Sequence, residues 1–300
     1  MVVGTPIGNL GDLSARAVAT LSSADIIYCE DTRHSRKLLT HAGITGVALR
    51  SLHEHNEQDR VDEVVSAIAE GRTVAMVSDA GMPTVSDPGA RVVAAVAAAG
   101  LTVTVVPGPS AALAALVASG LPTDRFCFEG FLPRSGRDRG ARLCALAAEP
   151  RTTVVFEATG RLGATLADLV RTCGGDRPVA VARELTKLHE EVWRGTLHEA
   201  VGRFATGGIR GEVVVVLGGA VDDGPPQIDD AVLSAALAER LEAGERTRGV
   251  VDDVAQQFQV GRRRVYELAL ALGTSQPVRS EGEGGGDGVP DGSEDSKKEE

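Results

Sequence analysis

The sequence is poor in aromatic residues, in cysteine and in long apolar runs. Aromatic residues make up 3% of the 300 residues, and Trp193 is the single tryptophan, so few platforms exist on which nucleic-acid bases could stack. The longest apolar stretch, 92–106, is interrupted by Gly100 and two threonines and is shorter than a membrane span. No membrane partner is therefore expected.

The cysteines form no C-x-x-C pair, and their spacings fit no zinc pattern. Isolated cysteines in a chain of this size are typical of small buried side chains in a reducing compartment. Gly4, Pro6 and Gly8 interrupt any apolar run at the start, so no secretory signal is expected. These observations predict a cytoplasmic protein without a metal site.

An excess of positive charge is also missing, since the formal net charge is -11. Part of the excess negative charge lies in residues 279–300, which hold five Glu and three Asp against two Lys and one Arg. This Gly-rich tail is predicted to be disordered. The remaining body is still mildly acidic, so nucleic acid would have to bind a local basic patch.

Short Val/Ile runs alternate with Ala-rich helical patterns along the first 220 residues. This alternation predicts the α/β class, with a mostly parallel first sheet whose faces are both covered. The predicted divisions are an N-terminal α/β domain (1–120), a second α/β domain (121–222), a small helical module (228–274) and the acidic tail (279–300). Predicted strands lie at 2–3, 26–29, 47–49, 74–77, 102–106, 152–157, 178–183 and 212–217. Predicted helices include 60–70, 90–99, 137–148, 162–173 and 197–204.

Loops dense in Gly, Pro and Asp follow four of the first strands, at 4–10, 30–33, 78–83 and 107–110. In open α/β sheets, ligands bind beyond the carboxyl ends of the strands, so a site is expected at this edge. The first loop is not a G-x-G-x-x-G fingerprint, which disfavours a nicotinamide or ATP site.

Seven segments occur in the order and spacing of one family: 4–10, 30–33, 53–57, 78–89, 107–111, 126–133 and 183–191. Over residues 1 to about 220, the sequence resembles the ribosomal RNA small subunit methyltransferase I family of the tetrapyrrole methylase superfamily. The resemblance implies a homodimer that binds S-adenosylmethionine between two α/β domains. It also implies 2′-O-methylation of a cytidine in small-subunit (16S) ribosomal RNA, with the RNA or the small ribosomal subunit as partner.

The resemblance further implies which residues bind the methyl donor: Pro6, Ser78, Asp79, Ala80, Gly81, Pro83, Ser110, Ala111 and Ala158. An aspartate there can accept hydrogen bonds from a polar group of the donor, and the small residues leave room for it. Two departures stand out. Met82 replaces the usual threonine, and Thr159-Gly160 replaces a proline-containing pair.

Methyl transfer to a hydroxyl requires alignment of donor and acceptor, and a base for the hydroxyl proton. The catalytic candidates are Asp31, Arg33, His55, Glu57 and Lys187. His55 titrates near neutral pH, and Lys187 could lower the pKa of a hydroxyl or bind phosphate. The alternatives are a solvated loop or helix cap for the first four and an interdomain salt-bridge network for Lys187. His53 and His55 could suggest a metal, but no third ligand is evident.

Two arginine clusters are candidates for binding the RNA backbone: Arg134, Arg137 and Arg139, and then Arg262, Arg263 and Arg264. The second cluster begins the later helix of a pattern that resembles a helix-turn-helix within 250–272. The alternatives are a solvated helix face and a small packing module with an exposed basic turn.

Two competing functions remain open at this point. One is methylation of a corrin or porphyrin precursor on the same scaffold, and the other is a DNA-binding regulator that senses a nucleotide. The polar segments 30–33 and 53–57 and the basic module favour RNA. A single such module on an acidic body would bind DNA weakly.

Overall fold

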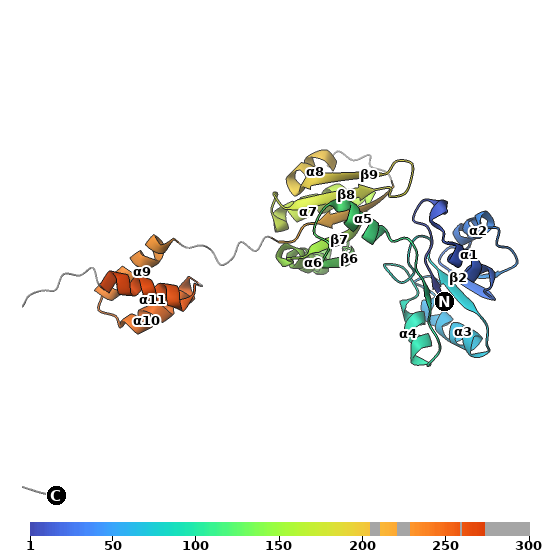
Figure 1. Cartoon of the computed structure of the whole chain (residues 1–300), viewed down its shortest axis with the longest axis horizontal. Coiled ribbons are helices and arrows are strands. Elements are labelled where there is room, and N and C mark those ends of the chain that lie inside the picture. The colour runs from blue at the N-terminus through green and yellow to red at the C-terminus, as the bar shows by residue number, and fades with distance from the viewer. Residues whose placement is uncertain (205–210, 221–228, 259, 274–300) are drawn as a thin grey trace, which may run out of the picture. The chain divides into compact units, whose positions relative to one another are not determined.

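The computed structural model describes residues 1–204, 211–220, 229–258 and 260–273. It divides into two compact units, Met1–Val221 and Asp222–Glu300. Among the described residues, the first unit contains two five-stranded sheets and the second contains three helices (Figure 1). The predicted tail at 279–300 lies outside the described residues.

The first sheet is parallel throughout and has the strand order β3-β2-β4-β1-β5. This confirms the predicted parallel sheet. The strand predicted over 102–106 is shorter than expected, because only Val105 and Val106 pair with the short first strand. The strands are β1 (Val2–Val3), β2 (Ile26–Cys29), β3 (Ala48–Ser51), β4 (Val74–Val77) and β5 (Val105–Val106).

Helices cover both faces of this sheet, since alternate side chains of each strand point to opposite sides. Ile27 and Cys29 pack with α1 and α2 on one face, whereas Ile26 and Tyr28 pack with α3 and α4 on the other. The helices are α1 (Ala15–Ser22), α2 (Thr32–His41), α3 (Glu57–Ala69) and α4 (Ala90–Ala98), with a 3-10 turn η1 (Leu10–Asp12).

The second sheet is mixed, with the order β6-β7-β10-β8-β9. Only β6 and β7 run parallel, and the other neighbours are antiparallel. Its strands are β6 (Phe126–Phe131), β7 (Thr152–Ala158), β8 (Pro178–Arg183), β9 (Glu191–Thr196) and β10 (Glu212–Leu217). Its helices are α5 (Ala111–Ser119), α6 (Gly136–Ala148), α7 (Leu162–Cys173) and α8 (Leu197–Phe204), with a 3-10 turn η2 (Thr159–Arg161).

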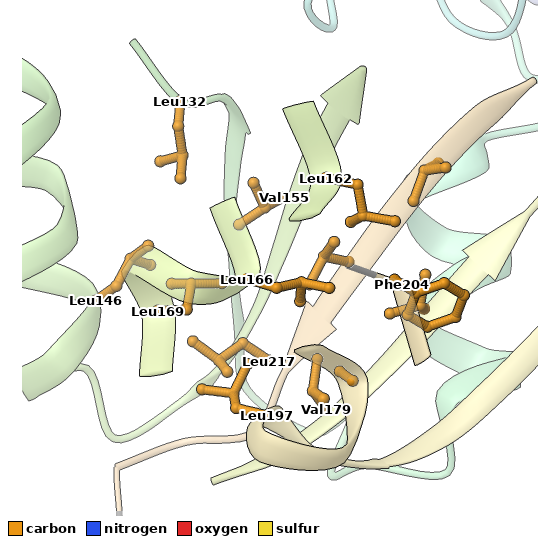
Figure 2. Packing of buried hydrophobic residues seen from close by; sticks show 14 of the residues in the cluster. Leu132, Leu146, Val155, Leu162, Leu166, Leu169, Val179, Leu197, Phe204 and Leu217 are labelled. Atoms are coloured by element: carbon orange, nitrogen blue, oxygen red, sulfur yellow. The ribbon is translucent and has the colours of Figure 1, made fainter. Parts of the chain in front are cut away.

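The last strand of the unit, β10, lies at the centre of this sheet and is buried on both faces. Val213, Val215 and Leu217 pack with α6, α7 and α8 in the main apolar cluster (Figure 2). Val214 and Val216 point the other way, towards α5. Burial on both sides explains why the strand is a continuous valine run.

Helix α5 belongs to the second sheet. Ala112, Ala115 and Leu116 are buried against β7, β8 and β10. The side chains therefore change from packing on the first sheet to packing on the second before α5, near residue 110. The Ala-rich sequence of α5 does not reveal which sheet it covers.

The second unit is a three-helix module within the predicted range 228–274. Its helices are α9 (Asp230–Glu242), α10 (Thr247–Gln257) and α11 (Arg262–Gly273). Leu233, Leu237, Val254 and Val265 form part of a buried cluster of its own. Among the described helices, none is both long and apolar enough to span a membrane.

Candidate functional site

The loops after β1, β4 and β5 meet at one edge of the first sheet. The Thr5 N–H donates to the Gly81 carbonyl oxygen at 2.9 Å, and the Gly81 N–H donates back at 3.2 Å. Gly4 approaches Gly108 so closely that a Cβ on Gly4 would lie 2.7 Å from the Gly108 Cα atom. Only glycine permits this contact between the two backbones. The site expected at the carboxyl ends of these strands therefore has a compact floor.

A cavity of about 430 Å³ opens above this floor, and residues from both α/β domains line it. Five of the predicted donor residues contribute: Ala80, Gly81, Ser110, Ala111 and Ala158. The remaining wall is mostly apolar: Ile7, Met82, Val85, Phe131, Phe156, Val213 and Val214. Its volume and its apolar wall with a few polar groups are typical of small-molecule sites. We call this space the donor cavity.

The other predicted donor residues lie elsewhere. Pro6 and Asp79 line a neighbouring cavity instead. Ser78 is buried, and its hydroxyl donates to the Ala80 carbonyl oxygen at 3.2 Å. Pro83 is buried as well. Neither Ser78 nor Pro83 lines the donor cavity.

Sequence reasoning did not assign several residues that line the donor cavity. They include Ser86, Asp87 and Thr159, together with Gly211 just before β10 and Glu212 at its start. Asp87 lies in the segment 78–89 that the family motif already marked. The β10 residues gave no signal, because their place beside β7 follows from a sheet order that the sequence does not show.

The loop beside the donor cavity holds its backbone in an uncommon conformation. Thr84 and Ser86 have φ angles of 73° and 65°, in the left-handed region that residues with a Cβ rarely adopt. Such conformations cost about 1–3 kcal/mol each and often occur at ligand sites. Burial raises the pKa of Asp87 to about 6, and the nearby carboxylates of Glu30 and Asp79 add to this effect.

A second cavity of about 570 Å³ adjoins the donor cavity. The two share Ile7, Ala80 and Glu212 in their walls. The other lining residues are Thr5, Pro6, Gly8, Leu10, His34, Lys37, Leu38, Asp79 and Lys187. We call this space the acceptor cavity.

Lys187 is the predicted catalytic residue that the structure brings into the acceptor cavity. Its ammonium Nζ lies 2.9 Å from Glu184 Oε1 and 3.4 Å from Glu212 Oε2. Burial lowers the pKa of Lys187, but the hydrogen bond with Glu184 and the charge of Glu212 outweigh it, so the pKa is raised. Lys187 is therefore a cation at neutral pH and cannot serve as the base. Lys187 thus forms salt bridges, as the alternative interpretation predicted, and also lines the acceptor cavity.

Asp31, Arg33 and His55 do not line either cavity. The Asp31 carboxylate caps α2 by accepting a hydrogen bond from the Arg33 backbone N–H at 2.8 Å. The backbone N–H of Asp31 donates to Asp79 Oδ1 at 3.2 Å. The Arg33 guanidinium pairs with Asp31 at 3.2 Å and is 90% exposed. His55 is exposed, and its ring centroid lies 6.1 Å from that of His53.

Glu57 has a structural position that differs from the predicted catalytic one. Its side chain is 7% exposed, and Oε1 accepts the N–H groups of Gly89 and Arg91 at 3.0 and 2.8 Å. These are free donors at the start of α4, so Glu57 caps that helix from α3. Glu57 therefore has the position of the helix-cap alternative, and it does not line the donor or the acceptor cavity.

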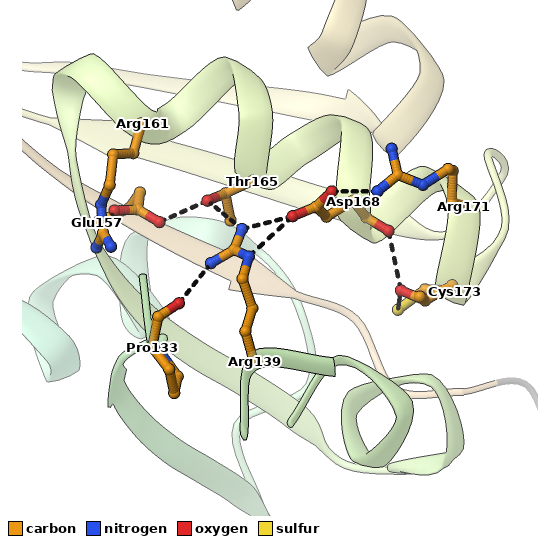
Figure 3. Close-up of polar contacts among 9 residues, drawn as sticks. Pro133, Arg139, Glu157, Arg161, Thr165, Asp168, Arg171 and Cys173 are labelled. Carbon is orange, nitrogen blue, oxygen red and sulfur yellow. Dashed lines mark hydrogen bonds and ion pairs between the residues drawn. The ribbon is translucent and has the colours of Figure 1, made fainter. Parts of the chain in front are cut away.

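Arg139, one of the predicted RNA-binding residues, forms contacts within the protein. Its guanidinium donates to Asp168 Oδ2 at 2.7 Å, to Thr165 Oγ1 at 3.0 Å and to the Pro133 carbonyl oxygen at 2.9 Å (Figure 3). The side chain is 12% exposed. It connects α6 to α7 and has no free face for a phosphate.

The remaining arginine candidates differ in how they are paired. Arg134 and Arg137 are exposed on the loop before α6 and at its start. In the second unit, Arg262, Arg263 and Arg264 begin α11 and pair with Asp252, Glu267 and Asp230 respectively. Much of the positive charge at the start of α11 is thus compensated locally. Within the described part of the chain, no group of three His, Cys, Asp or Glu residues could hold a metal ion.

Comparison with known proteins agrees with this geometry. The family model described as Tetrapyrrole (Corrin/Porphyrin) Methylases matches residues 1–201. The ribosomal RNA small subunit methyltransferase I of Synechocystis sp. is 44% identical over 271 residues, which are 90% of this chain and 97% of the relative. The protein of the same name from Mycobacterium bovis is 47% identical over 268 residues, which are 89% and 92% of the two chains.

Solved structures share the fold at lower identity. The methyltransferase CobJ aligns with a TM-score of 0.56 at 24% identity, over 73% of this chain and 92% of that chain. A uroporphyrin-III C-methyltransferase from Thermus thermophilus, complexed with S-adenyl homocysteine, aligns with a TM-score of 0.50 at 22% identity, over 73% and 96% of the two chains. Both likenesses support the two-domain α/β fold.

Proposed function

The chain belongs to the ribosomal RNA small subunit methyltransferase I family, and on this premise we propose that it transfers a methyl group from S-adenosylmethionine to the ribose 2′-hydroxyl of a cytidine in small-subunit ribosomal RNA. One observation supports this function best. The donor cavity and the acceptor cavity share a wall at Ile7, Ala80 and Glu212, so a small donor and a larger acceptor can meet there.

The donor cavity fits S-adenosylmethionine by its size and lining. Ala80, Gly81, Ser110, Ala111 and Ala158 would hold the donor, because their small side chains leave the backbone accessible. When bound, S-adenosylmethionine supplies a methyl group on a positively charged sulfur. The apolar wall excludes water from that group.

The wall that the two cavities share contains a carboxylate that could accept the proton of the acceptor hydroxyl. Glu212 Oε2 lies 3.4 Å from the Lys187 ammonium, and Glu212 lines both cavities. We assign to Glu212 the removal of the 2′-hydroxyl proton, with Lys187 stabilising the negative charge that develops on oxygen. Asp79 accepts a hydrogen bond from the Asp31 backbone N–H and contributes a second carboxylate to the acceptor cavity.

Ribosomal RNA, or the small ribosomal subunit that contains it, is the proposed partner, and the cytoplasm is the proposed location. We also propose a homodimer. Helix α5 supports this, because it is apolar on all sides and its outer residues Leu113 and Val117 are 51% and 76% exposed. A helix that is apolar all round is normally buried, and a second copy of the chain would cover this face.

The test is transfer of a labelled methyl group from S-adenosylmethionine to small ribosomal subunits, to free small-subunit RNA and to tetrapyrrole precursors. The expected product is 2′-O-methylcytidine, identified by mass spectrometry after digestion of the RNA to nucleosides. Label in a tetrapyrrole with none in RNA would favour the competing activity instead. Glu212→Gln should lower kcat strongly and change the donor Kd much less. Glu242→Gln, which changes an exposed carboxylate on α9 that lines neither cavity, serves as the control.

A further inference from the structure

Helix α2 carries a concentrated positive face on an acidic protein. Its ten residues, Thr32–His41, contain two arginines, one lysine and two histidines, and no aspartate or glutamate. Ser35, Leu38 and Leu39 are the buried residues of the helix, and the basic side chains are exposed to solvent. The chain as a whole has a formal net charge of -11, which makes this local reversal of sign notable.

The charges on this face are available to a partner. Arg36 and Lys37 are exposed, and neither forms an ion pair with any residue that the structure describes. Among the residues that the structure describes, Arg33 pairs with the partly exposed Asp31 beside it. The three arginines that begin α11 differ, since each has a carboxylate partner. A phosphate would therefore meet less competition on α2 than on α11.

The basic face is continuous with the proposed acceptor site. Arg33, Arg36, Lys37, Thr40 and His41 line a shallow depression on the outside of α2. Lys37 and His34 also line the acceptor cavity. Lys37 thus belongs to both surfaces, and the acceptor cavity in turn shares its wall with the donor cavity.

From this continuity we propose that the exposed face of α2 binds the sugar-phosphate backbone of the RNA next to the nucleotide that is methylated. The inference rests on the proposed function and adds the surface that holds the substrate strand. An arginine guanidinium can donate two parallel hydrogen bonds to the oxygens of one phosphate, and a lysine ammonium adds a compact positive charge. From Arg33 to His41 the helix rises about 12 Å, which is enough to reach more than one phosphate.

The test compares Arg36→Glu and Lys37→Glu with the wild-type protein and with Arg91→Glu. Arg91 is an exposed arginine on α4, which covers the opposite face of the same sheet, so it controls for a change in net charge. Three quantities are measured on each protein: the Kd for S-adenosylmethionine by calorimetry, the Kd for an unmethylated small-subunit RNA transcript across a range of salt concentrations, and kcat/KM for methyl transfer.

We expect Arg36→Glu and Lys37→Glu to weaken RNA binding roughly tenfold. Each variant should also reduce the slope of log K against log salt by about 0.7 for every RNA phosphate that it no longer neutralises. The donor Kd should stay at the wild-type value, and Arg91→Glu should match the wild type in all three quantities. Unchanged donor binding would also show that the α2 variants are folded.

The outcomes separate this inference from the proposed function. If the wild type methylates RNA while the α2 variants bind it as Arg91→Glu does, the α2 surface is overturned and the function stands. If the wild type binds RNA through α2 but transfers no methyl group to it, the function fails and the surface stands. Binding to whole small ribosomal subunits is measured in parallel. If the α2 variants lose this binding but keep binding to free RNA, the partner of α2 is an acidic protein and the inference is overturned.

Discussion

At the scale of single residues, Asp87 should make stability depend on pH. Its folded pKa of about 6 lies above the ordinary value of 3.8, because burial disfavours the charged form. The fold therefore favours the neutral carboxyl, and this stabilisation is complete below 3.8 and lost as pH rises through about 6. We expect Asp87→Asn to raise the thermal midpoint relative to the wild type increasingly between pH 4 and about pH 7. Asp124→Asn, at an exposed position, controls for net charge, and an equal shift in both variants would refute the assignment.

Glu57 provides a second residue-scale prediction. Glu57→Ala leaves the N–H groups of Gly89 and Arg91 without their acceptor and should lower the free energy of unfolding by about 1–3 kcal/mol. Glu57→Gln keeps one acceptor oxygen and should lose less. Urea unfolding measures both, with the exposed Glu54→Ala as control. Normal stability of Glu57→Gln together with lost turnover would restore a catalytic role.

Much of the donor cavity could be predicted from the sequence, because its small residues follow strands directly. Ala80, Gly81, Ser110 and Ala111 come just after β4 and β5, where an open α/β sheet places its ligands. Residue type alone did not separate Asp79, which lines the acceptor cavity, from these neighbours. That difference depends on which way each side chain turns within one loop.

At the scale of helices and strands, local patterns and long-range pairing differ in how well the sequence reveals them. The strands at 178–183 and 212–217 have the predicted bounds, because apolar runs there stop at polar or glycine residues. The order of these strands, and the assignment of α5 to the second sheet, depend on partners far away in the chain. Periodicity carries no information about such partners.

The packing of α6 against α7 supports a prediction at this scale. Arg139→Ala removes the hydrogen bonds to Asp168, Thr165 and the Pro133 carbonyl, and should lower the free energy of unfolding by about 2–3 kcal/mol. Arg137→Ala, on the exposed side of the same helix, should change it by less than about 0.5 kcal/mol. Chemical denaturation tests both. Equal stability of the two variants would show that the network contributes nothing.

At the scale of the whole molecule, the exposed face of α5 predicts the oligomeric state. Val117→Glu places a charge on the most exposed large apolar residue of the helix and should convert a dimer into a monomer. Light scattering coupled to size-exclusion chromatography measures the mass in solution. Thr40→Glu, on the exposed side of α2, is the matched control and should leave the mass unchanged. A wild-type protein that is already monomeric at micromolar concentration would contradict the proposed dimer.

The central position of β10 has a consequence for how the protein is made. Ribosomes synthesise the chain from residue 1 onward, and domains tend to fold as units as they emerge. The first sheet is complete once Val106 has emerged, but the second sheet lacks its middle strand until Leu217 follows. Until then β7 and β8 have no common neighbour, and the wall that Val213 and Val214 give to the donor cavity is absent. The nascent chain therefore acquires its binding site only near the end of the first unit, well after its amino-terminal half has had time to fold.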